Sequence, residues 1–214
     1  MLVRFAAAIA AMVVVVTASN ILVQYSVDAQ LGPFNLKDLL TWGAFTYPFA
    51  FLVTDLTNRH DGPVRARMVV VVGFIVALGL SFWLATPRIA IASATAFLVG
   101  QLLDISVFSR LRMSRNWVLP PLAGSLFGSL LDTLIFFGIA FSPALGFIDR
   151  LFGMEDGSLG FPAPWLGIGA EVPLWTSLAT GDFLVKFLAA LLLLAPYRAL
   201  MGRIMPLPPL GARA

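Results

Sequence analysis

MVVVVGFIVALGLSFWLAT, residues 68–86, is a run of 19 residues that contains no charged side chain. In an α-helix this run rises about 28 Å, close to the ~30 Å thickness of the hydrocarbon core of a membrane. The core has no water to satisfy backbone N–H and C=O groups, so an apolar run of this length has to be helical. A strand of a membrane barrel is about half as long and alternates polar with apolar residues. The run therefore predicts a transmembrane helix.

Five further apolar runs accompany this one, and each has roughly the length of a membrane span. The six predicted spans are 5–25, 42–58, 68–86, 89–108, 117–141 and 174–197. A long segment rich in Gly and Pro, 142–173, should lie outside and cap the bundle or rest on the membrane surface. The first run also resembles a signal peptide, but its length favours a retained span. We predict an all-α integral membrane protein, a six-transmembrane-helix bundle that forms a single domain over 1–214.

The composition of the chain excludes several classes of protein. Of its 214 residues 59% are hydrophobic and 12% are charged, and that charged fraction is about half of what a soluble domain carries. No cysteine is present, and the single histidine, His60, argues against a His-based metal site or catalytic triad. The basic residues form short clusters without interleaved aromatics, so we expect no nucleic-acid partner. We also expect no metal and no cofactor.

The distribution of Lys and Arg predicts the orientation of the bundle. If the N-terminus is cytoplasmic, ten basic residues lie on the inner side, and only Lys37, Arg88 and Arg150 lie on the outer side. The ten are Arg4, Arg59, Arg65, Arg67, Arg110, Arg112, Arg115, Arg198, Arg203 and Arg213. This excess predicts that the N- and C-termini are both cytoplasmic.

Five charged residues lie inside the predicted spans, where each costs at least ~2.5–3.5 kcal/mol on insertion scales. They are Asp55, Asp104, Asp132, Asp182 and Lys186. Asp55 and Asp104 should lie near the cytoplasmic ends of their spans, and Asp132 near mid-membrane or outward of it. Asp182 should lie in the outer half, one helical turn from Lys186. A cost of this size indicates a function for the group as a whole.

Structural roles are the alternative for each of these charges. Asp55 and Asp104 precede arginine-bearing loops by a few residues and are candidates for ion pairs at the inner boundary. Asp182 and Lys186 have the i,i+4 spacing of a structural pair. Asp132 has no loop charge near it in sequence, so pairing with Lys186 is its structural alternative.

Two of the aspartates occur in matching stretches, GQLLDISVF at 100–108 and GSLLDTLIF at 128–136. In both stretches a glycine precedes the aspartate by one helical turn and leaves space beside the carboxylate. Small residues at a spacing of four let helices approach closely, so helix packing is favoured over a slot for a ligand. The two spans should run antiparallel, which argues against an internal duplication.

Two polar features near the outer ends of the first two spans remain ambiguous. Asn20 either contacts lipid headgroups or binds a ligand. Pro48 removes a backbone hydrogen bond just after Tyr47. Broken helices in membranes can line a cavity, although a plain kink is the favoured interpretation.

Three longer stretches contain Asp55, Asp104 and Asp132. They are TWGAFTYPFAFLVTDLTNRHDGPVRAR at 41–67, GQLLDISVFSRLRMSRNW at 100–117 and LPPLAGSLFGSLLDTLIFFGIAF at 119–141. All three resemble the bacterial queuosine precursor transporter family, also described as putative vitamin uptake transporters. The resemblance implies a multi-pass carrier of the bacterial inner membrane, not an enzyme. It would import 7-cyano-7-deazaguanine, and also its aminomethyl relative, for tRNA modification.

The resemblance leaves two alternative functions open, and one is a carrier of the same type that moves another nucleobase or vitamin. The chain could also be the substrate-binding membrane subunit of a vitamin or nucleobase transporter that needs a separate ATPase module. The family favours a carrier without an ATPase partner, with the deazapurine and membrane lipid as its contacts, and homo-oligomerisation stays open. Paired intramembrane aspartates also occur in aspartyl proteases. Here the Gly-x-Gly-Asp signature is absent and the two carboxylates should lie at different depths.

The implied substrate suggests a role for each polar residue. A deazaguanine presents two adjacent donors, which one carboxylate accepts together, and a carbonyl oxygen, which needs a donor. Asp132 is the favoured carboxylate, followed by Asp182 and Asp104. The candidate donors are Lys186, Gln101 and Asn20, and the candidate aromatic contacts are Phe45 and Tyr47, with Phe127 and Phe136. Asp55 and Asp104 are candidates for proton coupling.

Overall fold

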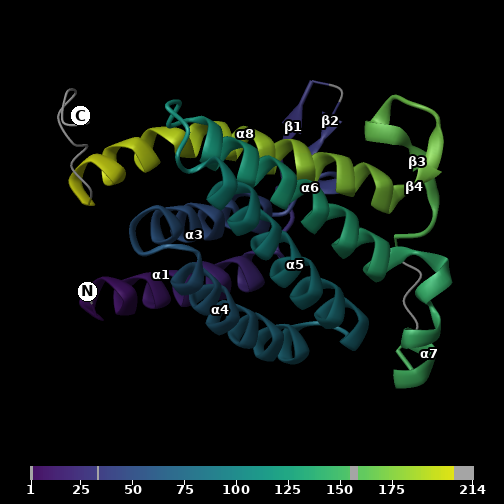
Figure 1. Ribbon diagram of the computed structural model, residues 1–214. Coiled ribbons are helices and arrows are strands. Elements are labelled where there is room, and N and C mark those ends of the chain that lie inside the picture. Colours follow the sequence, from purple (N-terminus) through teal and green to yellow (C-terminus); the bar gives the residue numbers. More distant parts are fainter. Residues whose placement is uncertain (1, 33, 155–158, 205–214) are drawn as a thin grey trace, which may run out of the picture.

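The fold is a bundle of helices with two small hairpins at one end (Figure 1). The structure is a computed structural model that describes residues 2–32, 34–154 and 159–204, without the side chains of Asp38 and 202–204. The helices are α1 (Leu2–Leu22), α2 (Gly43–Thr46), α3 (Pro48–Asp61), α4 (Pro63–Leu84), α5 (Pro87–Leu111), α6 (Leu119–Phe141), α7 (Phe147–Phe152) and α8 (Leu174–Ile204). Two antiparallel pairs are formed by β1 (Gln30–Leu31) with β2 (Phe34–Asn35) and by β3 (Pro162–Pro164) with β4 (Glu171–Pro173).

Five of the predicted spans are long apolar helices. α1, α4, α5, α6 and α8 each have the length and composition to cross a membrane, so a helical protein with several spans is confirmed. The boundaries differ most at α8, which ends at Ile204 rather than near residue 197, and at α4, which begins at Pro63 rather than near residue 68. Gly62 has a φ of 87°, a conformation that favours glycine, and Pro63 suits the first position of a helix. Arg65 and Arg67 therefore lie in the first turns of α4 and not in a loop.

The remaining predicted span consists of two helices. α2 and α3 follow one another, and Tyr47 separates them because Pro48 has no N–H to continue the hydrogen-bond ladder. α3 has only 14 residues, fewer than a span needs. The number of six spans therefore stays a prediction.

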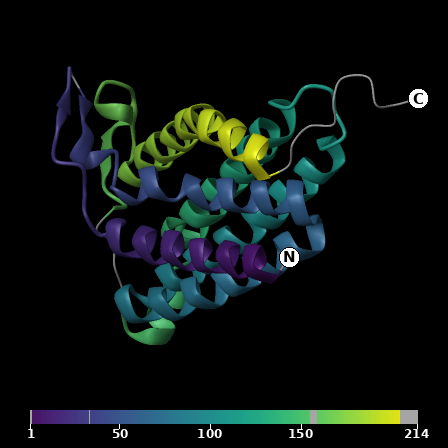
Figure 2. The same ribbon diagram turned by 90° about the vertical axis from the view of Figure 1, so that its left-hand side faces the viewer.

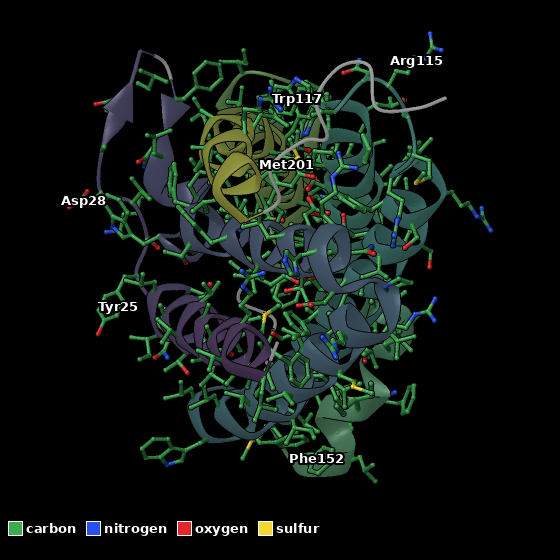
Figure 3. The ribbon with its side chains drawn as sticks, turned by 60° about the vertical axis from the view of Figure 1, so that its left-hand side comes forward. Tyr25, Asp28, Arg115, Trp117, Phe152 and Met201 are labelled. Atoms are coloured by element: carbon green, nitrogen blue, oxygen red, sulfur yellow. The ribbon has the colours of Figure 1, made fainter. Side chains whose placement is uncertain are left out.

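The two ends of the bundle differ in charge and in structure. α1 begins and α8 ends at the same end, and both hairpins lie at the other end (Figures 1 and 2). An even number of crossings produces this arrangement, which supports α2 and α3 together as the sixth. At the end where α1 begins, Arg59 donates hydrogen bonds to Tyr197 Oη at 3.2 Å and to Arg112 O at 2.5 Å. Trp117 and Met201 lie there as well, whereas Tyr25 and Asp28 are far from them (Figure 3).

Which end faces the cytoplasm stays a prediction from the arginine count, and Arg213 lies outside the described residues. The expected outer segment 142–173 contains residues 155–158, which are also outside the description. Its described part is not a plain loop, because it forms the short turn η2 (Pro143–Leu145), α7, the β3–β4 hairpin and the turn η3 (Trp165–Gly167). A buried ion pair between Arg88 Nη1 and Asp149 Oδ2, 2.5 Å apart, fixes α7 to α5.

The closest helix packing is between α5 and α6, which run antiparallel. A Cβ added to Gly100 would lie 2.9 Å from the Cβ of Asp132 and 3.0 Å from the backbone oxygen of Gly128. A Cβ added to Gly128 would lie 2.8 Å from the ring of Phe51 and 2.9 Å from the backbone oxygen of Gly100. The interpretation of these glycines as packing positions is confirmed.

This packing makes Gly128→Ala a destabilising change. Overpacking of this kind costs typically ~1–3 kcal/mol, because Phe51 or the backbone of α5 must move. Gly138 lies on the same helix with no atom within 4 Å of an added Cβ, so Gly138→Ala is the matched control. The control should gain up to ~1 kcal/mol of helix propensity. Thermal unfolding of the purified protein in detergent measures both effects, and equal midpoints for the two variants would contradict the packing.

Candidate functional site

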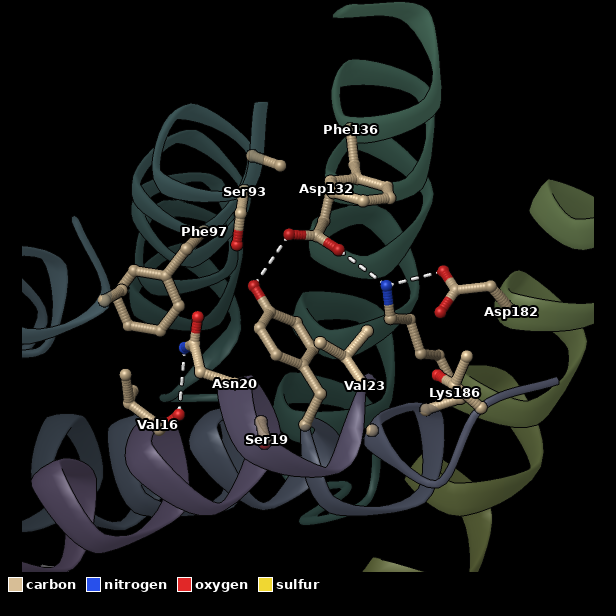
Figure 4. A pocket seen from close by; sticks show the side chains of 16 residues that line it. Val16, Ser19, Asn20, Val23, Ser93, Phe97, Asp132, Phe136, Asp182 and Lys186 are labelled. Atoms are coloured by element: carbon tan, nitrogen blue, oxygen red, sulfur yellow. Dashed lines mark hydrogen bonds and ion pairs between the residues drawn. The ribbon is translucent and has the colours of Figure 1, made fainter. Parts of the chain in front are cut away.

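A cavity lies between α1, α2, α4, α5, α6 and α8, in the half of the bundle away from its termini (Figure 4). The space that its lining residues enclose, open solvent included, is about 620 Å³. Val16 and Ala77 contribute apolar wall, and Ser19, Asn20 and Ser93 contribute polar groups. The mixture suits a flat ligand that carries several hydrogen-bonding groups.

Two carboxylates and one ammonium group meet at the wall of this cavity. Lys186 Nζ lies 2.6 Å from Asp132 Oδ2 and 2.6 Å from Asp182 Oδ2. Tyr47 Oη donates a hydrogen bond to Asp132 Oδ1 at 2.7 Å, and Thr133 Oγ1 donates to Asp182 Oδ2 at 2.8 Å. Both pairings left open by the sequence, with Asp132 and with Asp182, are thus formed at once. We call Asp132, Asp182 and Lys186 the charged triad.

Local sequence explains how the triad is assembled. Asp182 and Lys186 lie one turn apart on α8, so their side chains share a helix face. Asp132 comes from α6, where Gly100 of the facing helix leaves room for it. Tyr47 lies at the break between α2 and α3, and its ring centroid is 4.8 Å from the Lys186 ammonium. The break therefore places a hydroxyl and an aromatic face beside the triad.

The charges of the triad do not cancel. One ammonium group neutralises only one of the two carboxylates, and burial makes the remaining negative charge costly. Both oxygens of Asp132 are engaged, by Tyr47 and by Lys186, and its side chain is 5% exposed. Asp182 is 19% exposed, and its Oδ1 makes no hydrogen bond within the described part of the chain. Asp182 therefore has an oxygen with no partner among the described residues, whereas each oxygen of Asp132 already accepts one hydrogen bond.

The aromatic walls differ from those expected. Tyr47 and Phe136 line the cavity as predicted, whereas Phe45 and Phe127 are not among its lining residues and are 40% and 51% exposed. Phe97 supplies a wall that the sequence analysis missed, with its ring centroid 6.1 Å from that of Tyr47. Its position, seven residues before Asp104 and on the same helix face, was the available signal.

Asn20 lies in the wall of the cavity. Its Nδ2 donates to Val16 O at 3.0 Å, and its Oδ1 accepts a hydrogen bond from Ser81 Oγ at 2.7 Å. These bonds fix the side chain and join α1 to α4. Asn20 can still present the second amide hydrogen to a ligand.

Gln101, Asp104 and Asp55 do not line this cavity. They lie closer to the end where α1 begins, between α3, α5 and α6. Asp104 has no hydrogen-bond partner for either oxygen among the described residues, so its alternative role in an ion pair at the inner boundary is not seen. Asp104 Oδ1 instead lies against Gly124 of α6.

A second, smaller cavity lies on the far side of the triad. Asp55, Ser125, Ser129 and Tyr197 are among the residues that line it. Lys186 lines both cavities. The triad therefore separates a larger cavity from a smaller one along the axis of the bundle.

Sequence comparisons place the chain among known transport proteins. The profile of the family described as "Putative vitamin uptake transporter" matches residues 80–200, which include Asp104, Asp132, Asp182 and Lys186. The "Queuosine precursor transporter" of Escherichia coli (strain K12) is 44% identical over 147 residues, 59% of this chain and 64% of the relative. The "Probable queuosine precursor transporter" of Haemophilus influenzae is 35% identical over 195 residues, 74% of this chain and 83% of the relative.

The coverage of these relatives is uneven. The match to the E. coli protein spans less than two thirds of that protein's length. A Bacillus subtilis protein, also named "Probable queuosine precursor transporter", is 30% identical over 128 residues, 47% of this chain and 56% of its own length. No solved structure shows a significant match.

Proposed function

The chain belongs to the putative vitamin uptake transporter family, and from this premise we propose that it imports a queuosine precursor across the bacterial inner membrane. The proposed substrate is 7-cyano-7-deazaguanine, with 7-aminomethyl-7-deazaguanine as a second. The names of the relatives support the substrate class. The observation that carries the proposal for this chain is the charged triad in the wall of a cavity that aromatic side chains also line.

The triad complements the edge of a guanine. This edge presents a carbonyl oxygen, a ring N–H and an exocyclic amine in a row, and proteins read such bases by hydrogen bonds to that edge. The ammonium group of Lys186 is a donor suited to the carbonyl oxygen, and Oδ1 of the neighbouring Asp182 is an acceptor that no described residue engages and that suits the adjacent N–H groups. In the protein a donor, Lys186, is followed by an acceptor, Asp182. In the ligand an acceptor, the carbonyl oxygen, is followed by the N–H donors, so the two edges are complementary.

The walls of the cavity complement the flat rings of the base. Phe97 and Phe136 line the cavity, and Tyr47 lies between the triad and Phe97. Stacking of a base on an aromatic side chain is worth ~1–3 kcal/mol. We propose these three rings as the stacking contacts, in place of Phe45.

The two cavities on either side of the triad suggest how the substrate crosses. We propose that the larger cavity receives the precursor from outside and that the smaller cavity, toward the arginine-rich end, is part of its exit to the cytoplasm. The triad, Tyr47 and Asn20 form the substrate site between them. Release then requires Lys186 to exchange partners, because its side chain borders both cavities.

Binding of matched ligands tests the proposed recognition. The purified protein should bind 7-cyano-7-deazaguanine at least ~100-fold more tightly than the analogue that lacks the exocyclic amine. A site built to hydrogen-bond an N–H group rejects a ligand without it, because a buried acceptor is then left unpaired. Isothermal titration in detergent gives both affinities. Equal affinities would show that the carboxylate does not read this edge.

A further inference from the structure

A second group of buried polar atoms lies outside the substrate cavity. Asp55 is 2% exposed, and Gln101 and Asp104 are fully buried. Asp55 Oδ1, Gln101 Nε2 and both oxygens of Asp104 have no hydrogen-bond partner within the described ranges. A buried polar group without a partner costs ~1–3 kcal/mol, and more when it is charged. The side chains around this group therefore leave it unsatisfied.

Gln101 is held beside this group by Thr54. Thr54 Oγ1 lies 2.9 Å from Ala50 O and donates a hydrogen bond to Gln101 Oε1 at 2.6 Å. Among the described residues, Gln101 Nε2 is then a donor without an acceptor, whereas Asp55 Oδ1 and both oxygens of Asp104 are acceptors without a donor. The two carboxylates therefore lack a donor.

The surrounding charges do not supply that donor. Hydrogen bonds between Thr54 and Gln101 and between Asn58 Nδ2 and Ile105 O join the stretch of α3 that contains Asp55 to the stretch of α5 that contains Asp104. Arg59 follows Asp55 by one turn on α3. Arg59 is engaged with Tyr197 and Arg112. On α8, Tyr197 and Lys186 face the same smaller cavity as Asp55, and Lys186 is paired with Asp132 of α6 and with Asp182.

We propose that Asp55 and Asp104, together with Gln101, form a proton-binding site that couples uptake to the proton gradient. This inference rests on the proposed transport function. One proton bound to a carboxylate removes one negative charge and supplies the missing donor, as in carboxylate pairs that share a proton. Each cycle would carry that proton inward with the substrate.

A proton fits this site better than a metal cation. Hard cations need about six oxygen ligands, whereas the described residues contain no cluster of three or more His, Cys, Asp or Glu side chains. Asp104 Oδ1 also lies against Gly124, which leaves no space for an ion on that side. A proton needs neither space nor a shell of ligands.

Lys186 connects the proton site to the substrate site. Its side chain lines the smaller cavity, as Asp55 does, and its ammonium group is paired with the carboxylates of Asp132 and Asp182. Loss of the proton leaves the Asp55–Asp104 pair more negative and favours movement of Lys186 toward it. Such movement would take the donor away from the substrate, so proton release and substrate release would occur together.

Uptake into vesicles tests this coupling. Purified protein in lipid vesicles should concentrate 7-cyano-7-deazaguanine about tenfold for an inside-alkaline gradient of about one pH unit if one proton accompanies each substrate. Asp104→Asn should abolish this concentration while it keeps the affinity within about threefold and keeps exchange of internal for external substrate. Asp28→Asn, at an exposed aspartate, is the matched control and should behave as wild type.

Each other outcome contradicts a distinct claim. Wild type that binds no substrate refutes the proposed transport function, and the coupling inference falls with it. The wild-type protein could instead bind and exchange substrate without concentrating it in response to the pH gradient, or concentrate it in response to a sodium gradient. Either result refutes the proton site alone. If Asp104→Asn does not fold, a pH-sensitive dye inside wild-type vesicles decides the question, because coupled entry must acidify the interior.

Discussion

Lys186→Met is expected to lower the free energy of unfolding by about 3–5 kcal/mol and to abolish binding of 7-cyano-7-deazaguanine. Removal of one partner from a buried ion pair leaves an uncompensated charge, and here it leaves two carboxylates, Asp132 and Asp182. The change also removes the proposed donor to the substrate carbonyl. Thermal unfolding and titration of the purified variant measure the two effects.

A second substitution separates stability from binding. Lys186→Met combined with Asp132→Asn returns the site to one negative charge, so most of the lost stability should return while binding stays absent. Lys37→Met, at an exposed position, is the control and should change neither property. A Lys186→Met protein as stable as wild type would show that the triad is not the buried ion cluster described above.

Asp182→Asn should weaken binding of the precursor by at least about 100-fold with only a modest loss of stability. Hydrogen bonds to charged groups contribute ~1.5–3 kcal/mol, and the amide can accept only one of the two substrate N–H bonds well. The fold should survive because Lys186 keeps its partner Asp132, 2.6 Å away. Titration of the substrate and thermal unfolding in detergent provide the measurements.

Asp132→Asn is the informative comparison for this prediction. Asp132 holds Tyr47 and Lys186 in place, so its loss should lower stability more than the loss of Asp182 does. Asp28→Asn should leave affinity and stability unchanged. If Asp182→Asn binds the precursor with an affinity within about threefold of wild type, a carboxylate other than Asp182 binds the substrate.

The sequence predicted the apolar helices well because a membrane imposes a simple rule of length and hydropathy. It predicted boundaries less well where special backbone residues decide them. Gly62 and Pro63 start α4 before the apolar run begins, and Pro48 divides α2 from α3 although the hydropathy continues through it. The β1–β2 hairpin had no hydrophobic signal at all, since its strands have two residues each.

The charged residues of the site were identifiable because each is costly in a span, but their grouping was not. An i,i+4 spacing linked Asp182 to Lys186, whereas the approach of Asp132 depends on how closely α5 and α6 pack. The separation of Asp104 from the substrate cavity depends on the same packing. The aromatic residues that line the cavity were harder to predict. Phe45 and Phe97 both lie in apolar runs, and only the helix face that each occupies distinguishes them.

Salvage of the precursor by living cells tests the central claim most directly. The host would be a bacterial strain that cannot synthesise 7-cyano-7-deazaguanine and lacks its own transporter, and queuosine in its tRNA would be measured after the precursor is supplied at low concentration. We expect this chain to restore queuosine and an equally abundant Asp182→Asn variant to fail. Absence of queuosine with well-expressed, membrane-inserted wild type would contradict the account and indicate another substrate or a requirement for an ATPase partner.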